Sequence, residues 1–314
     1  MSRHKLMPRT LRVSVIRVVI ALLLVMGATS LRPSSRLMAS SEVDDGSAGQ
    51  SAQGATLKPA AATSPDIPLS DYDPEAEQVL LDLANQARAQ AGAPRLTLDA
   101  GLSRAARAHA EAMFASRQLS HQFEGELSLP QRLAAATHTQ LDQEGENVAL
   151  DLDASQAQRH LMLSPPHRAN LLNPAYNVVG LGVVRSGGRL YIVQDFGHAL
   201  TNYSAAEVKD RVAATVAQAR HHANQPDLAR HDLPTVDDAA CSMAQADKLN
   251  TIPIHQLAQL YTVLAYASPR PETLPANAGR ALTSRKLHSF SVGTCYARTG
   301  TYPTGAYWVV LSLE

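Results

Sequence analysis

The chain has 314 residues, of which 45% are hydrophobic and 18% charged, and its 28 basic side chains balance 28 acidic ones. A net charge of zero leaves no whole-chain basic field, so nucleic acid is not expected as a partner. At roughly 150 residues per domain, the length suggests two modest domains with additional segments. Aromatic residues make up only 4%, which predicts cores built from small aliphatic side chains.

The first 30 residues have the pattern of a secretory signal peptide. Basic residues from Arg3 to Arg17 precede an apolar run, 18–26, and small residues follow it. The run is shorter than the roughly 20 residues that span a bilayer. We therefore expect a secreted or periplasmic protein with no stable membrane insertion after removal of the signal. A protein anchored in the membrane by an uncleaved signal is the alternative.

Residues 31–73 are dominated by Ser, Ala, Gly, Pro and Asp and predict a flexible linker. Helix start signals follow in chain order. Asp73 with Pro74 opens a first helix, and Asp99 caps a second one, whose apolar face includes His109. Three further helices are predicted from a Ser or Asp followed three positions later by Glu or Gln, and these begin at Ser128, Asp153 and Ser204.

Two runs rich in Val, Leu and Ile, 178–185 and 190–194, flank Ser186-Gly187-Gly188 and predict a β-hairpin. The helix before them must end ahead of Pro165 and Pro166. Because helices precede strands instead of alternating with them, the order favours an α+β layered domain over a parallel doubly wound sheet.

The tail of the chain repeats part of what precedes it. Residues 85–88 resemble 217–220, an offset of 132 positions, and two positions of slippage then align 102–106 with 236–240. The hairpin recurs as two runs, 291–296 and 306–310. The tail is therefore predicted to be a truncated second copy. Chance similarity between Ala-rich helices is the alternative.

Two histidines and a glutamate stand in local contexts that packing alone does not explain: His121, Glu146 and His167. Each is expected on a turn beside a helix end, where polar side chains can converge without interrupting a core. Two imidazoles and a carboxylate can bind zinc with an open position, or can serve as a general base and its orienting partner.

These residues belong to five ordered motifs: 109–113 (His-Ala-Glu-Ala-Met), 119–121 (Leu-Ser-His), 145–149 (Gly-Glu-Asn-Val-Ala), 164–174 (Ser-Pro-Pro-His-Arg-Ala-Asn-Leu-Leu-Asn-Pro) and 179–183 (Val-Gly-Leu-Gly-Val). In order and spacing the motifs resemble the bacterial branch of the CAP superfamily, also called the SCP domain. That superfamily takes in cysteine-rich secretory proteins, antigen 5 and plant pathogenesis-related proteins.

The resemblance implies an α+β fold, a three-layer α-β-α sandwich with a central cleft, over residues 74–200. Residues 201–314 would then be a second, truncated CAP-like domain. Cys241 and Cys295 fall on the second helix and the first hairpin strand of that copy. Because helices pack on the sheet in the family fold, the two cysteines are predicted to form a disulfide. Two free buried thiols are the alternative.

Family members place two His and two Glu in the cleft. His121 matches the first His, Glu146 the Glu of the Gly-Glu-Asn motif and His167 the second His, while Ser164 stands nearest the remaining Glu. Without that carboxylate, a two-carboxylate mechanism is in doubt and a zinc site with His121 and His167 as ligands is weakened. The predicted ligand site consists of His121, Glu146, Asn147, His167 and Arg168.

For several of these residues, a structural role is the alternative to ligand binding. Glu146 could hold backbone amides of a Gly-Glu-Asn turn, Asn147 and Asn170 could be turn residues, and Arg168 could pin a neighbouring carboxylate or a helix end. His109 is expected to face the core and to hydrogen-bond the backbone.

The function expected first is that of an exported binding module whose cleft takes a small apolar, lipid-like or cell-envelope ligand. The enzyme alternative is a metal-assisted hydrolase with His121 and His167 as ligands and Glu146 as base or third ligand. A third alternative is a structural or interaction protein with a vestigial cleft. The chain has no His-Glu-x-x-His, Gly-x-Ser-x-Gly or phosphate-loop motif.

Overall fold

The computed structural model describes residues 19–20 and 72–314. The predicted signal peptide and linker therefore lie outside the described residues, except for Val19–Ile20 and positions 72 and 73. Val19–Ile20 forms a short strand, β1, which pairs in parallel with β7 (Thr262–Ser268).

The first copy of the repeat contains five helices and four strands. In chain order they are α1 (Pro74–Gln90), β2 (Thr97–Leu98), α2 (Ala100–Ser116), α3 (Leu129–Ala136), β3 (Leu141–Asp151), α4 (Ala154–Leu163), α5 (Pro165–Leu172), β4 (Val178–Ser186) and β5 (Arg189–Ala199). The predicted caps of this copy are confirmed: Asp73 and Asp99 each accept a hydrogen bond from a first-turn amide, and Ser128 forms a capping box with Gln131.

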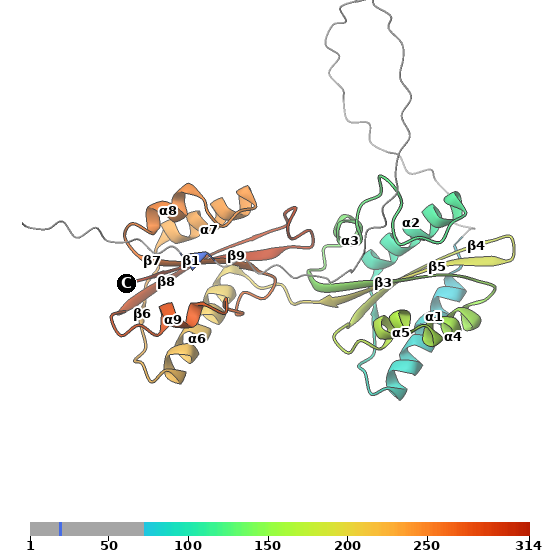
Figure 1. The fold of residues 1–314 in the computed structure, drawn as a ribbon, viewed down its shortest axis with the longest axis horizontal. Coiled ribbons are helices and arrows are strands. Elements are labelled where there is room, and N and C mark those ends of the chain that lie inside the picture. Colours follow the sequence, from blue (N-terminus) through green and yellow to red (C-terminus); the bar gives the residue numbers. More distant parts are fainter. Residues whose placement is uncertain (1–18, 21–71) are drawn as a thin grey trace, which may run out of the picture. The chain divides into compact units, whose positions relative to one another are not determined.

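The four strands of the first copy form one sheet in the order β2-β4-β5-β3. β4 and β5 are the predicted hairpin, and Gly187 and Gly188 at its turn have positive φ angles of 57° and 74°, as two-residue hairpin turns favour. Leu181 packs with α1, α4 and α5 on one face, and Val184 packs with α2 on the other. Figure 1 shows these helices above and below the sheet, which confirms the three-layer α-β-α sandwich.

The second copy repeats this architecture with shorter elements. They are α6 (Ala205–His222), β6 (Ala229–Arg230), α7 (Pro234–Ala246), α8 (Ile252–Leu257), β7, α9 (Ala278–Leu282), β8 (Ser289–Ala297) and β9 (Ala306–Leu313). The order β6-β8-β9-β7 matches β2-β4-β5-β3, with β1 added at the edge of β7. α7 and α8 cover one face of this sheet, and α6 and α9 cover the other (Figure 1).

A buried arginine marks the same place in each copy. The Nε of Arg88 donates to Pro94 O at 2.6 Å, and its terminal nitrogens donate to main-chain oxygens of Leu171, Asn173 and Tyr176. Arg220 repeats this pattern 132 positions later, with its Nε 2.6 Å from the carbonyl oxygen of Pro226 and Nη1 donating to the carbonyls of Leu282 and Ser284. The end of α9 therefore takes the place of the end of α5.

The second helices of the two copies correspond differently from the predicted alignment. Gly182 faces the backbone of α2 at Ala106 and Arg107, and Gly293 faces α7 at Val236 and Asp237. The left-handed C-cap residues of the two helices, Arg117 and Asp247, each have φ of 50° and lie 130 positions apart. The alignment of 102–106 with 236–240 is thus displaced by one helical turn. α2 has 17 residues and α7 has 13, so the missing turn lies at the start of α7.

Cys241 on α7 and Cys295 on β8 form a disulfide, with their Cα atoms 5.0 Å apart. The bond joins a helix of the second copy to its sheet. The predicted pairing is therefore confirmed.

Candidate functional site

His121 and Glu146 are in direct contact. Glu146 lies in the middle of β3 and is buried, whereas His121 lies in the loop between α2 and α3, and its side chain is 60% exposed. The Nδ1 of His121 is 2.9 Å from Oε1 of Glu146, which leaves Nε2 as the ring nitrogen available to a ligand. The hydrogen bond that His121 donates to Glu146 raises the pKa of His121, which favours the imidazolium form.

Arg132 on α3 holds the other oxygen of the same carboxylate. Its Nη2 donates a short hydrogen bond to Oε2 of Glu146, and its Nη1 donates to the main-chain oxygen of His121 at 3.1 Å. Arg132 is buried. One guanidinium therefore positions both the backbone and the carboxylate partner of His121.

His109 completes the inner side of this cluster. The ring is fully buried, as predicted, and its Nε2 donates to Ser120 O at 2.9 Å. Its Nδ1 is 2.7 Å from Oε1 of Glu126 and 3.0 Å from Nη1 of Arg132. Its contacts to Ser120 and Glu126 fasten the loop that carries His121.

Asp195 on β5 lies directly opposite Glu146 on β3 and is fully buried. Burial, and then the charge of Glu146, raise the pKa of Asp195 well above its usual value. We take Asp195 to be neutral. A second carboxyl group therefore adjoins the site, although it comes from β5 and not from the position of Ser164.

His167 lies on α5, and its Nδ1 is 2.9 Å from Oγ of Ser164. Burial, and then the charge of His121, lower the pKa of His167. The two imidazoles therefore interact electrostatically, with pKa shifts of opposite direction. That His121 and His167 belong to one ligand site stays a prediction.

Asn147 holds α5 against the sheet. It is fully buried, and its Nδ2 donates to His167 O and to Oε1 of Gln194, both at 3.1 Å. The Nδ2 of Asn170 donates to Asn147 Oδ1 and to Glu146 O, both at 3.0 Å. Asn147 therefore positions His167 through a hydrogen bond to its backbone. This structural role does not require Asn147 itself to contact a ligand.

Arg168 follows His167 on α5 and is exposed. Its guanidinium makes no hydrogen bond or ion pair with any residue in the described part of the chain. It is therefore a cation beside His167 that is available to a ligand.

The expectation that each site residue lies on a turn is wrong for two of the three. Glu146 belongs to an extended strand of 11 residues, because the Gly-Glu-Asn segment pairs with β5 throughout. His167 lies in a helix, because Pro165 and Pro166 occupy its first turn, where no backbone N–H is needed. Only His121 lies in a loop.

Sequence reasoning missed three members of the cluster: Glu126, Arg132 and Asp195. A signal was present for Asp195, which together with Gln194 interrupts a mainly apolar strand. Glu126 and Arg132 stand in polar segments, where nothing distinguishes them from solvent-facing residues.

The site does not fit a three-ligand zinc centre. Both oxygens of Glu146 are occupied, by His121 and by Arg132. Within residues 19–20 and 72–314, no group of three or more His, Cys, Asp or Glu side chains is placed to hold a metal ion. Metal binding by His121 and His167 stays a prediction.

Residues 81–196 match the model of the cysteine-rich secretory protein family, CAP. This segment is a CAP domain. The family resemblance of the five motifs is thereby confirmed. No curated protein matches the chain.

In the described residues, no helix of the CAP domain or of the second copy is long and apolar enough to cross a membrane.

Several solved structures are similar to the chain. An extracellular SCP-domain protein from Bacillus anthracis is 27% identical, covers 40% of this chain and 41% of its own, and has a TM-score of 0.37. An outer surface protein from Borrelia burgdorferi is 20% identical over 40% of this chain and 94% of its own, with a TM-score of 0.37. Na-ASP-1 is 9% identical over 79% of this chain and 91% of its own, with a TM-score of 0.46. The match spans about two fifths of the Bacillus anthracis protein.

Proposed function

We propose that the CAP domain is an exported binding module that holds the polar head group of a small lipid-like or cell-envelope ligand at His121. The proposal rests on the two contacts of the Glu146 carboxylate. One of its oxygens contacts buried Arg132, and the other contacts the exposed ring of His121. The buried side chains of Glu146 and Arg132 thus position the accessible imidazole of His121.

The second copy supports a functional role for these charges. The strand registers place Val263 and Ser312 at the positions of Glu146 and Asp195. Removing charges from water costs several kcal/mol per ion, and apolar replacements are often as stable. Because the same sheet forms without the charged residues, their presence in the CAP domain is better explained by the support they give His121 than by stability.

The exposed groups around His121 indicate the chemistry of the ligand. The raised pKa of His121 favours a cationic donor, and Arg168 adds a second cation. Leu119 and Leu163, near the two histidines in sequence, are exposed large apolar side chains. Cations together with exposed leucines suit an amphiphile with an anionic head group.

The test uses a short-chain phosphatidylglycerol below its critical micelle concentration as the probe, with binding measured by calorimetry. Losing a charge-assisted hydrogen bond corresponds to about 10- to 100-fold weaker binding, which we expect for His121→Asn. His160→Asn is the matched control, because His160 also pairs with a carboxylate, Asp151, and is 64% exposed. Equal affinity of wild type and His121→Asn would overturn the proposal.

Acid–base catalysis is the second candidate, and the opposite pKa shifts of His121 and His167 favour it. Such pairs of groups mark acid and base partners in many enzymes. If this function holds, hydrolysis of an ester probe such as p-nitrophenyl butyrate is lost in both His121→Asn and His167→Asn. Absence of turnover by the wild-type protein would argue against it. If neither binding nor turnover depends on these residues, the interaction protein becomes the leading alternative.

A further inference from the structure

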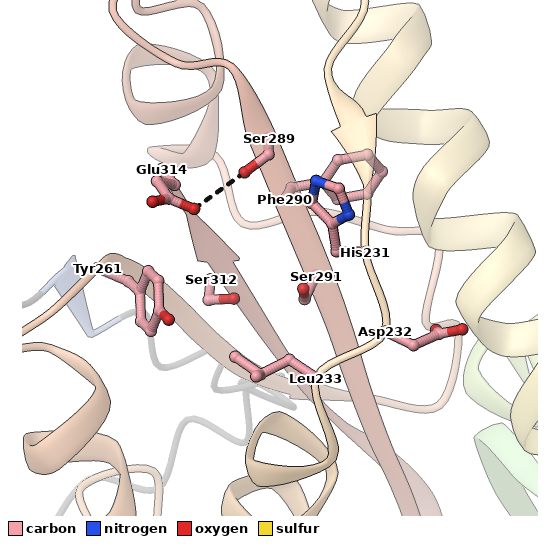
Figure 2. A pocket seen from close by; sticks show the side chains of 9 residues that line it. All are labelled: His231, Asp232, Leu233, Tyr261, Ser289, Phe290, Ser291, Ser312 and Glu314. Carbon is pink, nitrogen blue, oxygen red and sulfur yellow. Dashed lines mark hydrogen bonds between the residues drawn. The ribbon is translucent and has the colours of Figure 1, made fainter.

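We propose that the second copy carries a separate binding pocket for a monosaccharide-sized hydroxylated ligand with an amino group, of the amino-sugar class. A cavity of about 170 Å³ opens on one face of its sheet. Figure 2 shows its lining, which includes His231, Leu233, Tyr261, Ser291, Ser312 and Glu314.

The cavity occupies the place of the missing helical turn. In the CAP domain the first turn of α2 lies directly on β4, so that a Cβ on Gly180 would come within 2.1 Å of the carbonyl carbon of Leu102. The registers of the two hairpins place Ser291 at the position of Gly180. Because α7 begins only at Pro234, the extended segment from His231 to Leu233 replaces that turn and leaves the sheet uncovered at Ser291.

Two hydroxyl groups from largely buried residues face this opening. Ser291 and Ser312 pair directly across β8 and β9, and they are only 6% and 3% exposed. Neither hydroxyl forms a hydrogen bond with any residue in 19–20 or 72–314. Neither hydroxyl oxygen is among the fully buried unpaired side-chain atoms of the described residues, so both are accessible from the cavity and can hydrogen-bond a molecule bound there. Figure 2 shows them side by side on neighbouring strands.

The size and charge of the lining select the class of ligand. An engineered cavity of about 150 Å³ accommodates benzene, so this one accommodates a six-membered ring. The carboxylate of Glu314 lines it, whereas that of Asp232, another lining residue, points away from the two serines in Figure 2. Its described lining contains no Lys or Arg, which disfavours an anion and favours an ammonium group. Tyr261 supplies an aromatic ring for the apolar side of a sugar.

The experiment titrates D-glucosamine into the full-length protein and follows backbone amide shifts by NMR. We expect saturable shifts at Phe290, Ser291 and Ser312. Loss of two hydrogen bonds predicts about 30-fold weaker binding by Ser291→Ala/Ser312→Ala. Ser186→Ala, in a hairpin of the CAP domain, is the control and should bind as the wild type does. Ser291→Leu, which fills the cavity with an apolar side chain, should abolish binding.

The thermal midpoint of each variant shows that the fold is retained, and if the double variant unfolds, Ser291→Leu provides the test alone. Three outcomes would overturn the proposal: no saturable shift with glucosamine, shifts confined to the CAP domain, or wild-type affinity in a folded variant of the pocket. Equal affinity for D-glucuronate would overturn the assignment of a cationic ligand.

Discussion

The two copies share one architecture and differ in what their sheets bury. Both have the same order of four strands, with helices on both faces, and both bury an arginine on main-chain carbonyls. Where the CAP domain buries Glu146 and Asp195, the second copy has Val263 and Ser312. The fold therefore does not require the buried charges, and their role can be separated from its stability.

The first prediction gives the CAP domain the valine of the second copy. Glu146→Val removes one of the two carboxylates that pair with buried Arg132 and leaves only Glu126, which should lower the free energy of unfolding by about 3 kcal/mol. Adding Arg132→Met removes the arginine charge and should recover most of that loss. Urea unfolding measures both variants. A loss below about 1 kcal/mol in the single variant would show that the ion pair is not coupled to stability.

Removing the disulfide should affect the second copy alone. Cys241→Ser/Cys295→Ser is expected to destabilise it by about 4 kcal/mol, since the bond closes a loop across 54 positions. Hydrogen exchange should accelerate at β8 and β9 and remain unchanged at β4 and β5. Equal acceleration in both sheets would contradict an effect confined to one copy.

Exchanging the residues under the missing turn tests why the copies differ there. Gly180→Ser forces a side chain against the backbone of Leu102, and overpacking of this kind costs about 1–3 kcal/mol. The reciprocal Ser291→Gly should cost under about 1 kcal/mol, the typical effect of glycine in a strand. Thermal unfolding compares the two variants. Similar losses would mean that the space over Ser291 is not open.

The last prediction concerns the pH dependence of stability. The raised pKa of Asp195 means that its contribution to stability is complete below pH 4, the ordinary Asp range, and declines as the pH rises toward its folded value. Asp195→Asn stays neutral, so its free energy of unfolding at pH 7 should exceed that of the wild type. Urea unfolding from pH 4 to pH 8 measures the difference, with Asp238→Asn as an exposed control. An unchanged pH slope would refute a neutral Asp195.

Local signals predicted most of the helices. Asp73, Asp99 and Ser204 cap helices as expected, because a cap is a contact between residues three positions apart. β3 was not predicted, since its polar Gly-Glu-Asn stretch lacks the alternation of a typical strand. α5 was not predicted, since its two prolines argue against a helix except in the first turn.

The site was predictable only in part. Motif resemblance found His121, Glu146 and His167, whereas the roles of Arg132 and Asp195 depend on partners far away in the chain. The correspondence between residues of α7 and α2 could not be predicted from the sequence either, because Ala-rich helices align nearly as well when displaced by one turn. The pocket at Ser291 is a direct result of that difference in length.

The buried arginines also bear on how each copy folds. The terminal nitrogens of Arg88 donate to carbonyls 83 to 88 positions later, and Nη1 of Arg220 donates to carbonyls 62 and 64 positions later. Until those distant segments arrive, each charge is better left in water. We therefore expect α1 and α6 to dock fully only when the chain following them has closed a long loop. The folding rate of both copies is therefore expected to depend on contacts between segments that are far apart in the sequence.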